Sequence, residues 1–220
     1  MPTPTWNRLP AAKRDAVLAA AEAEFGERGF SGASLNTICR KAEISKGSLF
    51  QYFTDKADMY AHLAELASIR IRSAMETEVA RLPVRTDFFG ALDELIGAWV
   101  GYFYDHPRDR ALTAATNLEH DAPARAAVRA TVNRHYLEVL TPLVDLAHDS
   151  GQLRPDTDRD ALIALLLLLL PHLALAPHVQ GLDPVLGLEE GERKTAIDQG
   201  RRMLRLVVAP LRQEQSPSTD

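Results

Sequence analysis

Two short amphipathic segments between Ser34 and Phe53, separated by a few residues, constrain the fold of this chain more than any other feature. Apolar residues at positions 35, 38, 39 and 42 recur with the spacing of one face of an α-helix. Ser34 precedes this segment and Ser45 precedes the next. Serine is a favoured N-cap residue because its hydroxyl accepts a free backbone N–H. The stretch therefore predicts a helix, a tight turn and a second helix.

In the second predicted helix, we expect Leu49, Phe50 and Phe53 to point inward. The residues expected to point outward are Lys46, Ser48, Gln51 and Tyr52. A short exposed helix of this kind, braced by the helix before it, is the element that enters a DNA major groove. A pair of core helices would not need Lys46-Gly47-Ser48 before its apolar residues, so we favour DNA binding.

With its flanks, this stretch resembles the DNA-binding domain of the TetR family of bacterial transcriptional regulators. The resemblance runs from about Lys13 to Tyr60, and its most specific part is the string SKGSLFQYFTDK, from Ser45 to Lys56. The resemblance implies a DNA-binding regulator with an all-α fold. Together with the chemistry of the side chains, it assigns DNA contacts to Ser34, Thr37, Lys46, Gly47, Ser48, Gln51, Tyr52 and Lys56.

These residues divide into two roles, since phosphate contacts position a protein on DNA and base contacts read the sequence. Ser34 and Thr37 stand at a helix start, where backbone N–H groups favour a phosphate. Family members use the positions of Tyr52 and Lys56 for phosphate, and Gly47 allows the backbone to approach the duplex. The residues expected to read bases are Lys46, Ser48 and Gln51.

Two positions depart from the family pattern. Glu43 stands in the turn where the family usually has glycine, and a left-handed conformation there would cost about 1 kcal/mol or more. Phe50 replaces a usual tyrosine and so lacks a hydroxyl that could hold a phosphate. Both departures suggest weaker or differently placed contacts with the DNA backbone.

We expect an N-terminal three-helix helix-turn-helix domain over residues 1–60, with residues 1–9 as a loose arm. A long helix starting at Thr54 or Asp55 should lead into a helical ligand-binding and dimerisation domain over 61–212. Within that domain, Asp156 or Asp158 should cap the leucine-rich helix, and a disordered tail should occupy 213–220. No alternation typical of strands appears.

Composition and charge are those of a globular protein rather than of a uniformly basic one. The chain has a net charge of −5, of which residues 1–60 carry +1 and the remainder −6. DNA binding would therefore depend on a local patch, doubled in a dimer. The single Cys39 excludes an intramolecular disulfide, and no signal-peptide pattern opens the sequence, so we expect a cytoplasmic protein.

The remaining helices should hold an effector and a second subunit. The expected pocket residues are Trp99, Tyr102, Phe103, Asn117, Tyr136 and His172, with Glu119, His120 or His135 as further polar candidates. By resemblance to the family, the expected dimer interface comprises Leu162, Leu166, Leu169, Leu204 and Val208. The predicted function is a homodimeric repressor that a small hydrophobic or amphipathic ligand releases from its DNA operator.

Several alternatives stay open at this stage. An activator or a ligand-independent regulator would share the same sequence features. The leucine-rich run from Ala161 to Ala176 could belong to a membrane-associated binding protein, although it is shorter than the ~20 apolar residues of a spanning helix. We find no motif of a hydrolase, kinase or dinucleotide enzyme, and expect no catalytic, cofactor or metal site.

Overall fold

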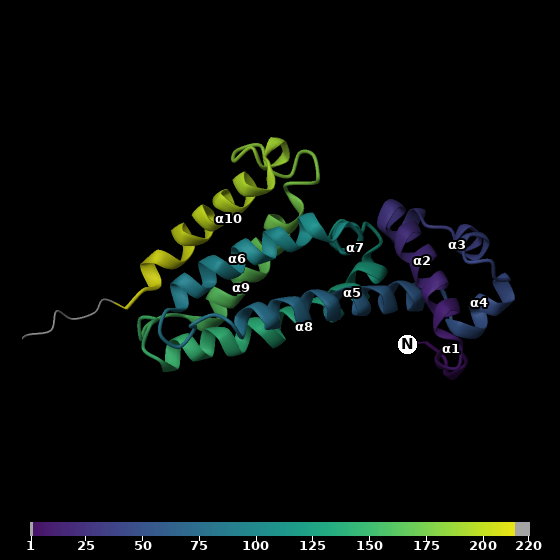
Figure 1. Cartoon of the computed structure of the whole chain (residues 1–220), viewed down its shortest axis with the longest axis horizontal. Helices are drawn as coiled ribbons and strands as arrows, with labels where there is room; N and C mark the ends of the chain where they lie inside the picture. Colours follow the sequence, from purple (N-terminus) through teal and green to yellow (C-terminus); the bar gives the residue numbers. More distant parts are fainter. Residues whose placement is uncertain (1, 214–220) are drawn as a thin grey trace, which may run out of the picture. The chain divides into compact units, whose positions relative to one another are not determined.

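The computed structural model describes residues 2–213, and these residues are mainly helical, with one isolated bridge between Leu153 and Arg212. The α-helices labelled in Figure 1 are α1 Pro4–Asn7, α2 Ala11–Gly32, α3 Leu35–Lys41, α4 Lys46–Tyr52, α5 Lys56–Val79, α6 Phe88–Asp105, α7 Pro107–Asn117, α8 Ala122–Asp149, α9 Arg159–Leu175 and α10 Arg193–Val208. Short 3₁₀ turns, η1 and η2, span Leu188–Glu190 and Ala209–Leu211. The predicted all-α class is confirmed. The tail expected over 213–220 lies, beyond Gln213, outside the described residues.

Two compact units make up the described chain. The first comprises the residues up to Ile71 together with His106–His135, and the second comprises Arg72–Asp105 and the residues from Tyr136 onward. Helices α5 and α8 each contribute residues to both units. The compact N-terminal unit therefore includes a later segment of the chain, α7 and the start of α8, that a division at residue 60 leaves out.

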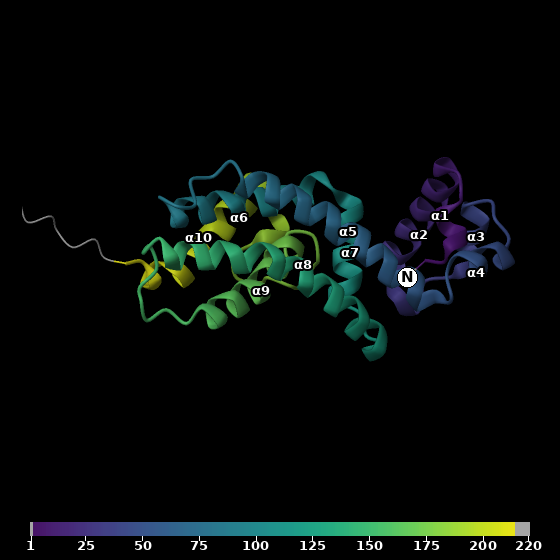
Figure 2. The same cartoon turned by 90° about the horizontal axis from the view of Figure 1, so that it is seen from below.

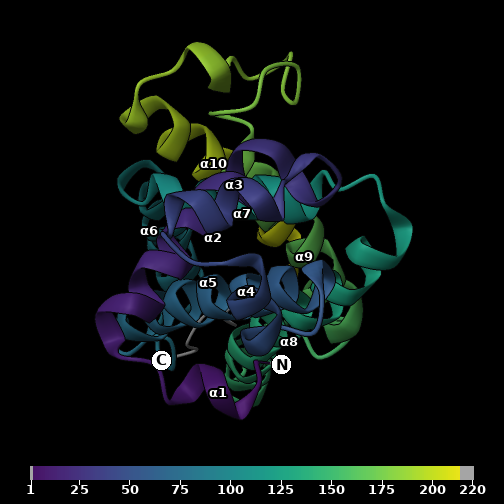
Figure 3. The same cartoon turned by 90° about the vertical axis from the view of Figure 1, so that its right-hand side faces the viewer.

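The core of the first unit forms where the apolar faces of α2, α3, α4 and α5 meet. Its fully buried members include Val17, Ala21, Phe25, Ile38, Leu49, Phe53, Met59 and Leu63. Gly29 interrupts α2 with a φ of 63°, a left-handed value that glycine adopts without steric cost. Gly29 therefore makes a sharp break in α2, after which one more helical turn follows. Figure 3 allows the path from α2 through α3 to α4 to be followed by colour.

The expectation of a loose N-terminal arm is wrong. Residues 4–7 form α1, and the Trp6 side chain is only 4% exposed. Its ring packs on Phe53, with the ring centroids 5.0 Å apart. Burying a large apolar ring removes enough surface from water to order a short segment. The polar composition of residues 1–9 gives no indication of this contact.

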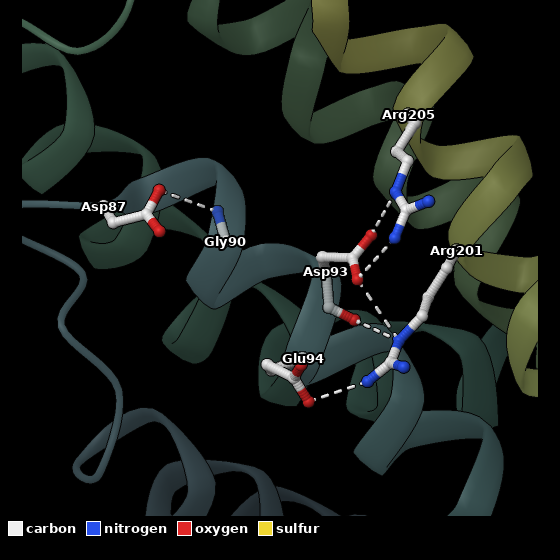
Figure 4. A network of polar contacts seen from close by, with 6 residues as sticks. All are labelled: Asp87, Gly90, Asp93, Glu94, Arg201 and Arg205. Atoms are coloured by element: carbon white, nitrogen blue, oxygen red, sulfur yellow. Dashed lines mark hydrogen bonds and ion pairs between the residues drawn. The ribbon is translucent and has the colours of Figure 1, made fainter.

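The second unit is built on α6, a largely buried helix that contacts both α9 and α10 (Figure 2). Figure 4 shows how α10 is fixed by charge: the guanidinium of Arg205 donates to Asp93 at 2.6 Å, and that of Arg201 donates to Glu94 at 2.7 Å. A Cβ added at Gly97 would lie 2.7 Å from the Arg201 guanidinium, so glycine leaves the space that this arginine fills. The Asp158 carboxylate caps α9, as one of the two predicted alternatives required.

Candidate nucleic-acid interface

The helix-turn-helix predicted from Ser34 to Phe53 is present, with both serine caps. The Ser45 hydroxyl accepts from the Ser48 N–H at 3.0 Å at the start of α4. The Ser34 hydroxyl accepts from the Thr37 N–H at a longer 3.4 Å at the start of α3. Each cap satisfies a backbone donor that has no partner inside its own helix. Local capping therefore fixes where both helices begin.

The outward face of α4 carries most of the residues predicted to read DNA. Lys46, Gly47 and Gln51 are exposed, and Ser48 is half-buried because its hydroxyl lies 2.9 Å from that of Ser45. A Cβ added at Gly47 would meet only the Ser45 oxygen, at 3.8 Å, so the packing of this chain does not itself require glycine there. An open backbone flanked by a lysine and a glutamine can approach a base-pair edge closely.

Two neighbouring residues of α4 point in directions opposite to those expected. Tyr52 was predicted to be outward but is 5% exposed, and its ring lies 5.8 Å from that of Trp6. Phe50 was predicted to be inward but is 45% exposed. The helical repeat explains both, because Leu49, Tyr52 and Phe53 stand at i, i+3 and i+4 and share one face, which excludes Phe50. The burial of its ring leaves Tyr52 poorly placed for the predicted phosphate contact.

The remaining predicted phosphate contacts sit at helix starts and are partly exposed. Ser34 and Thr37 are half-buried at the start of α3. The Ser34 N–H donates a hydrogen bond to the buried Glu24 carboxylate at 3.1 Å. Lys56, the first residue of α5, places its ammonium 4.9 Å from the centroid of the Phe30 ring. This cation–π contact orients the Lys56 side chain without neutralising its charge. All three residues stay candidates for holding phosphate.

The turn between α3 and α4 adopts the strained conformation anticipated for Glu43. Its φ is 53°, the left-handed region, and it is the one non-glycine residue with positive φ among residues 2–213. The Glu43 N–H donates to the Arg40 carbonyl at 3.3 Å, and the following Ile44 N–H donates to Cys39 at 3.0 Å. These bonds close the turn tightly enough to hold an unfavourable backbone angle.

Replacing Glu43 with glycine is expected to raise the free energy of unfolding by about 1 kcal/mol, because the left-handed conformation costs an L-residue roughly 1–2 kcal/mol. The larger entropy of glycine in the unfolded chain offsets part of this gain. Urea unfolding measures the difference. Glu27→Gly, an exposed change within α2, is the control and should lower stability. If Glu43→Gly lowers the free energy of unfolding as much as the control does, the backbone at Glu43 is not strained.

Sequence reasoning missed two charged clusters that connect distant segments of the first unit. The Glu119 carboxylate, from the connection between α7 and α8, accepts from the Phe30 N–H at 2.7 Å and from the Ser31 hydroxyl at 3.0 Å. Burial alone would raise the pKa of Glu119, but these donors and the Asp121 N–H lower it overall. Glu119 is therefore an anion that holds the last turn of α2, after the break at Gly29. The sequence suggests only a pocket role for this residue.

The second cluster centres on Arg70 of α5. Its guanidinium donates to Asp109 of α7 at 3.0 Å and to Glu22 of α2 at 2.9 Å. Both carboxylates are buried, at 4% and 9% exposure. Ion pairs between residues 39 and 48 positions apart leave no periodic signal in a sequence, so only the folded structure reveals them.

The predicted pocket residues divide between the two units. Trp99 and Phe103 are buried in the second unit, with ring centroids 5.0 Å apart, and the Trp99 N–H donates to the Leu170 carbonyl at 2.8 Å. The half-buried Tyr136 ring lies 5.5 Å from that of Trp99. The same unit also contains the predicted pocket residues Tyr102, which is buried, and His172, which is half-buried.

Asn117 differs from the other predicted pocket residues because it belongs to the first unit, where its amide makes hydrogen bonds. The amide nitrogen donates to the Thr113 carbonyl at 2.8 Å, and the amide oxygen accepts from Arg129 at 2.6 Å. Each group of the Asn117 amide thus already has one partner within the first unit. The sequence indicated only a polar residue near the end of a helix.

The predicted dimer residues are mostly on the wrong faces of their helices. Four of them are at most 4% exposed within their own subunit: Leu162, Leu166, Leu204 and Val208. Leu169 is half-buried. The exposed leucines are instead Leu165 and Leu168 on α9, at 48% and 74%, and Leu206 on α10, at 74%. The leucine run is apolar all round, so its sequence could not distinguish its two faces.

Within residues 2–213, no group of three or more His, Cys, Asp or Glu side chains is arranged to hold a metal ion. No helix described in the structure is both long and apolar enough to cross a membrane. Cys39 is buried, and burial raises the pKa of its thiol.

Comparisons with known proteins agree with this geometry. A sequence model described as bacterial regulatory proteins, tetR family, matches residues 17–63. The HTH-type transcriptional repressor AcnR of Corynebacterium glutamicum is 25% identical over 194 residues, covering 83% of this chain and 93% of AcnR. The repressor NicS of Pseudomonas putida is 27% identical over 146 residues, covering 65% of this chain and 66% of NicS. A TetR family transcriptional regulator from Chloroflexus aurantiacus superimposes with a TM-score of 0.63 at 26% identity, covering 97% of this chain and all of that one.

Proposed function

We propose that the chain is a member of the TetR family of bacterial transcriptional regulators and acts as a homodimeric repressor that a small effector releases from its operator. The observation that carries this proposal is the exposed face of α4, where Lys46, Gly47 and Gln51 stand together above a buried apolar face. Two such helices from a symmetric dimer would enter successive major grooves. This small, polar face with its lysine suits contact with base-pair edges in a major groove.

The dimer is proposed to form through the exposed leucines of α9 and α10. Leu165 and Leu168 are three residues apart and share one helical face, and Leu206 adds a third exposed apolar side chain. A second copy of the chain would remove this apolar surface from water, at roughly 25 cal/mol per Å² buried. One recognition helix alone buries too little surface for useful specificity, so the dimer is integral to the function.

The effector is proposed to be hydrophobic or amphipathic and to bind in the second unit beside Trp99 and Tyr136. Half-exposed Tyr136 and His172 could supply the polar contacts that orient such a ligand. A compound of this class should raise the melting temperature by mass action and weaken operator binding in the same concentration range. A compound that raises the melting temperature and leaves operator binding unchanged would not be the effector.

Replacing Lys46 with alanine is expected to weaken operator binding at least about fivefold, because a lost contact to a base typically costs ~1–3 kcal/mol. The melting temperature should stay the same, because Lys46 is exposed on the surface of α4. Gel-shift titration at fixed salt measures the affinity. Lys194→Ala, an exposed lysine of α10, controls for the loss of one positive charge. Equal affinities for the two variants would remove Lys46 from the interface.

A further inference from the structure

The N-terminal segment is attached to the last turn of the recognition helix α4. The Thr3 N–H donates to the carbonyl of Tyr52 at 2.9 Å, and the Thr3 hydroxyl donates to the carbonyl of Gln51 at 2.5 Å. The next turn places the Trp6 ring on Phe53 and against His62 of α5, with centroid distances of 5.0 and 6.1 Å. One short segment therefore contacts the end of α4 through both hydrogen bonds and packing.

These bonds supply what the end of α4 lacks. The last four carbonyls of an α-helix have no partner within the helix. Helix α4 has only seven residues, and because the Leu49 carbonyl accepts from the Phe53 N–H, the last three carbonyls of the helix lack a partner within it. Short helices fray readily, since few hydrogen bonds oppose the entropy of the open chain. The chain continues after Tyr52 in an extended conformation, with Phe53 at a φ of −130°, and no glycine or left-handed residue closes the helix.

The residue whose backbone is held is also one that the proposed function requires. Gln51 is exposed and is the candidate for bidentate contact with adenine. Such a contact needs both amide atoms at defined positions. A more mobile Gln51 backbone would therefore weaken the preference for the operator sequence more than it weakens non-specific binding to DNA. Thr3 makes no contact with the base itself. It acts on the helix that presents Gln51.

We propose that Thr3, with Trp6 behind it, is a positioning residue for sequence reading: it caps α4 from outside and fixes the backbone of Gln51. This inference rests on the proposed function, because it concerns the same recognition helix. The buried Trp6 ring fixes the position of α1. Thr3, just before α1, is thereby placed to donate two hydrogen bonds to carbonyls of α4.

The test compares Thr3→Val with Thr3→Ser and Thr5→Val in the full chain, with any purification tag at the C-terminus. Valine keeps the Thr3 shape and backbone N–H and removes only the hydroxyl donor, whereas serine restores the donor. Thr5→Val makes the same substitution at an exposed position of α1, the helix that follows Thr3. Thr3→Val should lower the ratio of operator to scrambled-DNA affinity about fivefold, the value of one ordinary hydrogen bond. Thr3→Ser and Thr5→Val should keep the wild-type ratio.

Hydrogen exchange of the free protein gives a second readout that needs no DNA. Thr3→Val should speed exchange of the Phe53 amide, which donates to Leu49 at 3.0 Å in the last turn of α4. If wild type does not prefer operator over scrambled DNA, the proposed function fails, whatever the exchange shows. If wild type discriminates and Thr3→Val discriminates equally well, the positioning role is overturned. Equal losses of specific and non-specific affinity would also overturn it, because that pattern indicates general destabilisation.

Discussion

Replacing Arg70 with methionine is expected to lower the free energy of unfolding by about 2–3 kcal/mol, less than the ~3–5 kcal/mol typical of breaking a fully buried ion pair. Methionine keeps much of the apolar stem but leaves the buried carboxylates of Glu22 and Asp109 without their shared cation. An unpaired buried charge is costly because the surrounding protein solvates it poorly. The reduction reflects the 42% exposure of the Arg70 side chain, which lets water compensate in part.

Urea unfolding at neutral pH measures this change. The matched control is Arg81→Met, since Arg81 is 67% exposed and pairs with Glu78 on the surface. Exposed pairs contribute roughly 0–1 kcal/mol, so the control should stay near wild type. If the two variants lose similar amounts, Arg70 does not hold α2, α5 and α7 together in the way its contacts indicate.

Replacing Leu168 with glutamate is expected to produce the second large effect, the loss of the dimer together with operator affinity. A charge on each subunit at a shared apolar surface would have to be buried without a partner. Linking two half-site contacts through a dimer strengthens binding by roughly 10²–10⁴, so a monomer should bind operator at least about a hundredfold more weakly. The fold should persist, because Leu168 is 74% exposed within its own subunit.

Analytical ultracentrifugation measures the oligomeric state, and gel-shift titration measures the operator affinity. Val185→Glu provides the control, since this valine of the loop before α10 is 83% exposed and lies outside the proposed interface. The control should remain a dimer with unchanged affinity. If the Leu168→Glu protein is still dimeric, the dimer interface does not include the exposed face of α9.

Most of the helix-turn-helix could be predicted from the sequence because its determinants are local. Ser34 and Ser45 cap the helices they precede, and Asp55 caps α5 through the Asp58 N–H at 2.8 Å. The errors within α4 arose at single positions, where reading Phe50 as inward ignored the 3.6-residue repeat. A short helix gives that repeat only two turns in which to show itself.

What could not be predicted depends on contacts between distant residues or on faces without contrast. Trp6 gave no sign that it would order α1, because its partner Phe53 lies 47 positions away. Arg70 and Glu119 are ordinary charged residues until the fold brings α7 beside α2. The run of leucines in α9 has no polar face, so Leu168 and Leu166 were indistinguishable until their burial was known.

Selection of DNA sequences by the wild-type protein, repeated with Gln51→Ala, tests the central claim that the exposed face of α4 reads DNA. Wild type should enrich an inverted repeat whose half-sites are centred about 10–10.5 base pairs apart or a multiple of that. Gln51→Ala should retain the repeat but lose preference at one position in each half-site, since glutamine specifies adenine. Random sequences from wild type, or identical motifs from the two proteins, would contradict the assignment of α4 as the reading element.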